Sequence, residues 1–128
     1  MIAMMMLAAA AATADRPPVA LVNKIEAHAL RDPCVRPLDQ WWRQYAFAVT
    51  FGPKGMIVRH DIVQVSMIEA GHNGHRAGRF IVAQPEPPKI DDSQFKFASG
   101  EYDIAGHRFT RWVCGSNWPP VKGPPRKP

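Results

Sequence analysis

The chain is 128 residues long and 46% hydrophobic, which is enough for one folded domain with a core and excludes a disordered protein. Its formal net charge is +5, but three of its basic residues lie in a proline-rich tail. Residues 15–118 hold 13 Lys and Arg against 11 Asp and Glu. Because acidic and basic residues alternate in this region, we expect no nucleic-acid partner.

The first fourteen residues, Met1 to Ala14, carry no charged side chain and end in Ala12-Thr13-Ala14. An apolar run closed by a small-x-small site is typical of a signal peptide, and it is shorter than the ~20 apolar residues that span a bilayer. The Lys or Arg that normally precedes such a run does not occur here. We expect residues 1–14 to be a cleaved signal peptide, and the mature chain to be periplasmic or secreted with no transmembrane segment.

The next segment shows helical periodicity. Pro17-Pro18 suits a first helical turn, apolar residues then recur at helical spacing, and Pro33 should end this helix near Arg31. A second, short helix is expected from Pro37, because further apolar side chains follow at helical spacing: Leu38, Trp41, Trp42 and Tyr45.

From Tyr45 the hydrophobic period changes to two, which predicts a first strand that ends at the turn Gly52-Pro53-Lys54-Gly55. Residues 56–69 predict a second strand with a break near His60-Asp61. Further β segments are expected at residues 79–84, from Ile90 through Phe97, and in a hairpin of residues 101–104 and 107–113.

This order of elements predicts an α+β fold with one or two N-terminal helices packed on a four- to six-stranded antiparallel meander. We expect residues 15–118 to form this single domain. Residues 119–128 form a basic, proline-rich tail that we expect to be extended or disordered.

The chain has two cysteines, Cys34 and Cys114. In an exported protein an even number of cysteines predicts a disulfide, and two cysteines allow one pairing. The Cys34–Cys114 bond would staple the start of the domain to its end and contribute roughly 4.5 kcal/mol. The alternative is a small envelope hydrolase, in which Cys34 at a helix start is the nucleophile and a histidine is the base.

His72 and His75 lie three residues apart and are weak candidates for a metal site. The glycines around them favour a solvated loop, and no third ligand stands at a recognisable spacing. The sequence contains no nucleophile elbow, phosphate-binding loop or dinucleotide motif, so we assign no catalytic residue and expect no cofactor.

Trp42 and Trp118 are the candidate binding residues, because an exposed tryptophan can stack on a sugar or anchor a protein partner. An exposed apolar patch larger than ~400 Å² around either would support this role. The leading hypothesis is a non-catalytic exported domain that binds a protein or an envelope component. The alternatives are the hydrolase with Cys34 or with a metal at His72 and His75, and a purely structural domain without a ligand.

Overall fold

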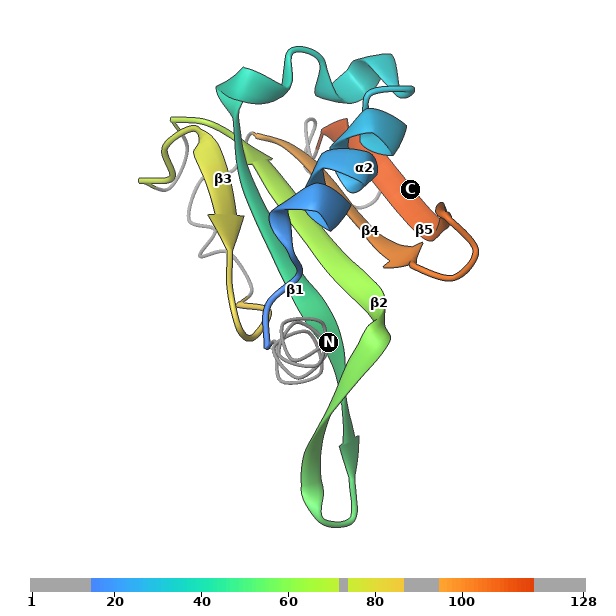
Figure 1. Cartoon of the computed structure of the whole chain (residues 1–128). Helices are drawn as coiled ribbons and strands as arrows, with labels where there is room; N and C mark the ends of the chain where they lie inside the picture. Colours follow the sequence, from blue (N-terminus) through green and yellow to red (C-terminus); the bar gives the residue numbers. More distant parts are fainter. Residues whose placement is uncertain (1–14, 72–73, 87–94, 117–128) are drawn as a thin grey trace, which may run out of the picture.

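A computed structural model describes residues 15–71, 74–86 and 95–116. In these residues one α-helix, α2 (Val19–Ala29), lies across one face of a five-stranded sheet, so the fold class is α+β (Figure 1). The strand order is β3-β1-β2-β4-β5. The strands are β1 (Trp41–Gly52), β2 (Gly55–Glu69), β3 (Gly78–Ile81), β4 (Lys96–Asp103) and β5 (Arg108–Ser116).

The sheet is mixed, which corrects the expected antiparallel meander. The pairs β1–β2, β2–β4 and β4–β5 are antiparallel, but β3 runs parallel to β1, with Trp42 opposite Gly78 and Tyr45 opposite Ile81. After Glu69 the chain does not turn back along β2. It passes the start of β1 and forms β3 on the side of β1 that faces away from β2. A parallel neighbour is the result, and a hydrophobic pattern alone does not reveal it.

The second helix expected from Pro37 is also corrected. Two short 3-10 turns, η1 (Pro33–Val35) and η2 (Leu38–Gln40), replace it, and β1 already begins at Trp41. The fold therefore has one α-helix in its described part. The expected helix near residues 18–31 and the hairpin formed by β4 and β5 are confirmed.

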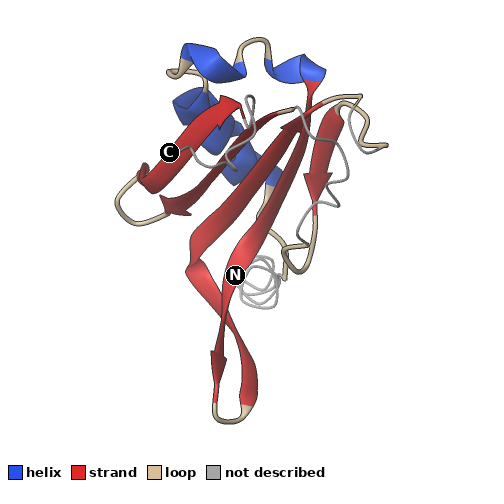
Figure 2. Ribbon diagram, turned by 180° about the vertical axis from the view of Figure 1, so that it is seen from behind, coloured by secondary structure: helices blue, strands red, loops and turns tan. Residues whose placement is uncertain are grey.

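The core lies between α2 and the face of the sheet that α2 covers. Figure 2 shows the sheet from its opposite side, with α2 behind it. Successive turns of α2 bury Val22, Ile25 and Ala29, which share one face of the helix because they are three and four residues apart. The sheet contributes alternate residues of its three central strands to the same cluster: Tyr45, Phe47, Val63, Val65, Met67, Ala98 and Tyr102.

A charged group in this interface fixes how α2 sits on β1 and β3. The buried Glu26 carboxylate accepts hydrogen bonds from the Tyr45 hydroxyl (2.6 Å) and from the Arg79 guanidinium, and Arg43 Nε lies 3.3 Å away. Burial raises the pKa of Glu26, but the hydrogen bonds from Arg79 and Tyr45 and the charge of Arg43 outweigh it, so the pKa lies below its ordinary value. Glu26 is therefore held as an anion between helix and sheet.

β1 and β2 continue as a pair beyond the rest of the sheet. Within the described chain, β3 pairs with β1 no further than Tyr45, and β4 pairs with β2 no further than Ile62. Past these points the two strands pair with each other as far as the turn at residues 52–55. Residues 48–59, called the arm below, project from the body as the narrow ribbon at the bottom of Figures 1 and 2.

A bulge in β2 marks the base of the arm. The register between the strands shifts after Phe47, and residues 60–62 have no partner on β1. The carbonyl oxygen of Asp61 instead accepts a hydrogen bond from the backbone N–H of Ile104 (3.0 Å). The break expected near His60-Asp61 is confirmed.

α2 is eleven residues long, and no helix in the described ranges has both the length and the apolar character needed to cross a bilayer.

Candidate functional site

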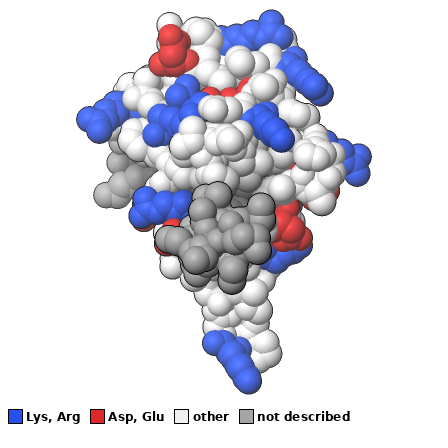
Figure 3. Space-filling view, in the orientation of Figure 1, with Lys and Arg blue, Asp and Glu red and all other residues white. Residues whose placement is uncertain are grey.

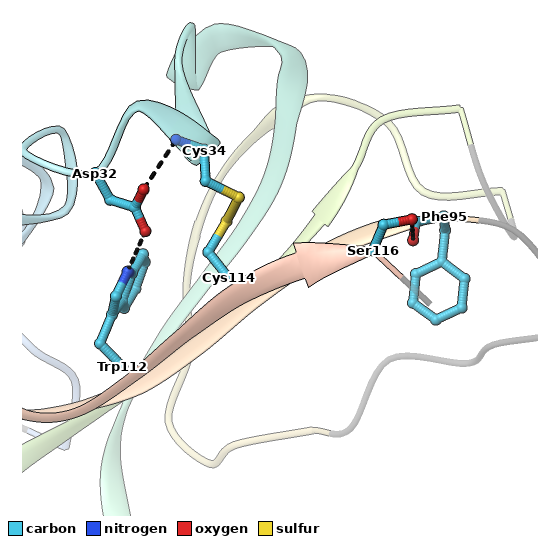
Figure 4. Close-up of a disulfide and its surroundings, with 6 residues drawn as sticks. All are labelled: Asp32, Cys34, Phe95, Trp112, Cys114 and Ser116. Atoms are coloured by element: carbon cyan, nitrogen blue, oxygen red, sulfur yellow. Dashed lines mark hydrogen bonds between the residues drawn. A yellow bond between two sulfur atoms is a disulfide. The ribbon is translucent and has the colours of Figure 1, made fainter. Parts of the chain in front are cut away.

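The two cysteines form a disulfide that ties η1 to β5 (Figure 4). The Cα atoms of Cys34 and Cys114 are 6.2 Å apart, and the bond closes a separation of eighty residues in the sequence. The expected pairing is therefore confirmed. It joins the turn after α2 to the last strand, so the two ends of the described domain are held together.

Asp32 organises the surroundings of the disulfide. Its Oδ1 atom accepts a hydrogen bond from the backbone N–H of Cys34 (2.9 Å), which caps η1, and its Oδ2 atom accepts one from Nε1–H of Trp112 (2.9 Å; Figure 4). The bonds from Trp112 and Cys34 lower the pKa of this carboxyl group. Trp112 is thus fixed beside the disulfide.

This arrangement bears on the chemistry considered for Cys34. Both sulfur atoms are bonded to each other, and a disulfide sulfur is not a thiolate nucleophile. Asp32, Cys34 and Cys114 place ligand atoms within 4.8 Å of one another, but a metal ion also requires thiolates. The disulfide and Asp32 therefore have a structural role, because the bond links η1 to β5 and the carboxylate caps η1.

Of the candidate metal ligands His72 and His75, the structure describes His75 alone. His72 lies outside the described residues. The ring of His75 packs edge-on against Trp42, with 4.7 Å between the ring centroids.

Trp42 is partly buried, and Trp118 lies outside the described residues. Besides the contact with His75, the Trp42 ring lies 6.2 Å from that of Phe80, which comes from the neighbouring strand β3. Trp42 therefore packs between elements of the body. The large apolar side chains that are most exposed lie elsewhere.

Three of the six exposed large apolar side chains in the described residues, including the most exposed one, lie together at the outer end of the arm. Phe51 is 80% exposed, Ile57 53% and Met56 41%, and all three lie within two residues of the turn at residues 52–55. Single exposed apolar residues are common on protein surfaces, but a contiguous group marks a contact surface. Three large ones on one narrow projection make the arm the candidate functional site.

Strand pairing places apolar side chains on both faces of the arm. Phe51 pairs with Met56 and Val49 with Val58, so these four side chains share one face. Ile57, the neighbour of Met56 along β2, points to the opposite face. The outer end of the arm is thus apolar on both of its sides.

The base of the arm is held to the body by polar and aromatic contacts. The ring of His60 lies 4.8 Å from that of Phe47, whose side chain is part of the core. Arg59 makes two hydrogen bonds to the Asp61 carboxylate, the shorter one 2.8 Å long. The projection therefore starts from a fixed point of the sheet.

The charges of the arm are all basic. Between Phe47 and His60 the sequence contains Lys54 and Arg59 and no acidic residue. Arg59 is paired with Asp61, which leaves Lys54 in the turn as the charge of the outer end. Figure 3 shows this end as a projection that is uncharged except for basic atoms at its extremity.

Compared with known protein families, curated proteins and solved structures, the chain matches none. A function has to be inferred from its own residues and contacts.

The sequence-based candidates did not include the arm. A length comparison would have found it: a helix of about 14 residues is roughly 21 Å long, whereas a strand of about 14 residues is roughly 46 Å long. Such a helix covers less than half of residues 56–69. About half of this strand was therefore bound to lack a cover from the expected helix, and the structure places the uncovered half next to the turn.

Proposed function

We propose that the protein is a small exported, non-catalytic binding domain that contacts a protein or an envelope component through the outer end of the arm. The observation that carries the proposal is the joint exposure of Phe51, Met56 and Ile57 at the end of a projecting hairpin. The free energy falls when a partner removes exposed apolar side chains of this size from water.

The length of the arm supports a role in binding. A connection between β1 and β2 needs two to five residues, and such a connection could join Phe47 to Val63, the last pair before the bulge. The chain instead continues for a further ladder of five paired positions. A two-stranded ribbon is at best marginally stable by itself, so this extension adds little to the stability of the domain.

The rest of the domain suits a carrier for such an arm. The Cys34–Cys114 bond, the Glu26 group and the buried face of α2 hold the body in one arrangement. A disulfide is compatible with an oxidising compartment, which agrees with export directed by residues 1–14. A rigid body with a projecting apolar end presents a binding element at low entropic cost.

Site-specific photo-crosslinking in the producing cell tests the proposal. A benzoyl-phenylalanine at position 51 replaces an aromatic side chain by a similar one, and the same residue at position 113 is the matched control. Val113 is 57% exposed, on β5 of the body. We expect adducts, with protein or lipid, from position 51 and not from position 113. Equal adducts from both positions, or none from position 51, would contradict the proposal.

A further inference from the structure

We propose that the outer end of the arm docks onto an anionic lipid surface, with Phe51, Met56 and Ile57 entering the boundary between headgroups and acyl chains. This inference rests on the proposed function and names the partner of the same site. Three features of the arm carry it: the distribution of its apolar side chains over two faces, its small width, and its charge.

The distribution over two faces favours a fluid partner. Phe51 and Met56 lie on one face of the ribbon and Ile57 on the other. A flat protein surface would cover one of these faces and leave the other in water. A lipid interface surrounds an inserted element and covers both faces together, as it does for other amphipathic elements that enter it by about 5–10 Å.

The width of the arm points the same way. Its two strands are about 5 Å apart, and its exposed apolar surface comes from three side chains. A stable protein interface buries about 800 Å² on each partner, which the end of so narrow a ribbon does not provide. Shallow insertion into lipid has no such minimum of contact area, because each apolar side chain contributes independently.

The charge of the arm complements an anionic surface. Lys54 stands in the turn, next to the apolar side chains, and the sequence from Phe47 to His60 holds no carboxylate that a lipid phosphate would repel. The ammonium group sits on a long flexible stem, so it can reach the phosphates while the neighbouring side chains enter the acyl boundary. Figure 3 shows basic atoms at the far end of an otherwise uncharged projection.

Co-sedimentation with lipid vesicles tests the inference. The oxidised full chain is mixed with vesicles of phosphatidylcholine alone or of equal parts phosphatidylcholine and phosphatidylglycerol. The test variants are Phe51→Ser with Ile57→Ser, and Lys54→Gln. The control is Val113→Ser, which removes a similarly exposed apolar side chain from the body. Residues 1–14 are identical in every sample, so a difference in binding between variants comes from the substituted positions.

We expect the double variant to bind the mixed vesicles at least about tenfold more weakly than the unchanged chain. Lys54→Gln should weaken binding to the mixed vesicles about fivefold and leave binding to phosphatidylcholine nearly unchanged. Val113→Ser should bind as the unchanged chain does. Circular dichroism and a thiol assay confirm that each variant is folded and oxidised.

Equal binding by all variants, or no binding by the unchanged chain, would overturn the lipid inference. The proposed function has a separate test, because adducts of position 51 with a protein would show that the arm binds a protein partner. Absence of both vesicle binding and position-51 adducts would overturn the lipid inference and the proposed function together.

Discussion

The two ends of the β1–β2 pair have the same alternation of apolar side chains, but these side chains are buried at one end and exposed at the other. In the body, Phe47 is 5% exposed beneath α2, whereas Phe51, on the same strand and the same face, is 80% exposed in the arm. The strand pattern is common to both ends, but α2 covers one of them (Figures 1 and 2). Alternation therefore tells which side chains share a face, and the covering element decides whether that face becomes core or contact surface.

Removal of the disulfide should have the largest effect, and its effect should be confined to the body. Cys34→Ser together with Cys114→Ser should lower the free energy of unfolding by about 4 kcal/mol, because the open chain regains the entropy that an eighty-residue loop restricts. Urea unfolding followed by fluorescence measures this change. A loss below about 1 kcal/mol would mean that the staple contributes little to holding η1 against β5.

A matched pair of phenylalanine substitutions on β1 tests the difference in burial between the body and the arm. Phe47→Ala should cost about 3–4 kcal/mol, because it leaves a cavity between α2 and the sheet. Phe51→Ala should change stability by less than about 0.5 kcal/mol, because its side chain is exposed. Both values come from the same urea titration. A comparable cost for Phe51→Ala would show that the arm packs against another part of the protein in solution.

Local sequence signals predicted several features correctly. Cysteine parity predicted the Cys34–Cys114 bond, the apolar spacing after Pro18 predicted α2, and the polar His60-Asp61 pair predicted the bulge at the base of the arm. Each of these signals depends on residues that are neighbours in sequence or on a count that allows one answer. Such signals do not depend on how distant parts of the chain pack, so they could be interpreted correctly without the structure.

The features that were missed depend on residues distant in sequence. Trp41 and Tyr45 fit helical spacing after Pro37, but their burial against α2 and the central strands favours β1 in that place. The parallel pairing of β3 depends on the path of the connection after Glu69, which has no period to read. The exposure of Phe51 depends on how far α2 reaches, so the alternation of its own strand could not show it.

Asp32 should give a smaller, pH-dependent effect in the body. Asp32→Ala removes the cap of η1 and the acceptor for Trp112, which should cost about 1–2 kcal/mol at neutral pH. The pKa of Asp32 is lowered by folding, so its contribution is complete above the unfolded pKa of about 4 and is lost as the pH falls through the lower folded pKa.

The difference in stability between the unchanged chain and Asp32→Ala should therefore shrink in acid, as measured by urea unfolding at a series of pH values. Asp39→Ala is the matched control, since Asp39 is exposed in η2 and makes no hydrogen bond to the described residues. A difference that stayed constant down to pH values below the folded pKa would contradict a role for the charged carboxylate.

The effect of Gly55→Ala should stay within the arm. Gly55 closes the turn with a φ of 113°, a conformation that costs an alanine about 1 kcal/mol or more even though no atom lies within 4 Å of the added Cβ. Because the arm pairs with no other strand of the described sheet, this strain should open the arm locally and leave the body closed.

Native-state hydrogen exchange distinguishes these two regions. In Gly55→Ala the amides of residues 49–58 should exchange about fivefold faster, whereas those of the ladder between β2 and β4 should keep their rates. Gly74→Ala, at another open position with a positive φ of 75°, should leave the arm amides unchanged. Equal acceleration in the arm and in the β2–β4 ladder would show that arm and body open as one cooperative unit, which would contradict local opening of the arm.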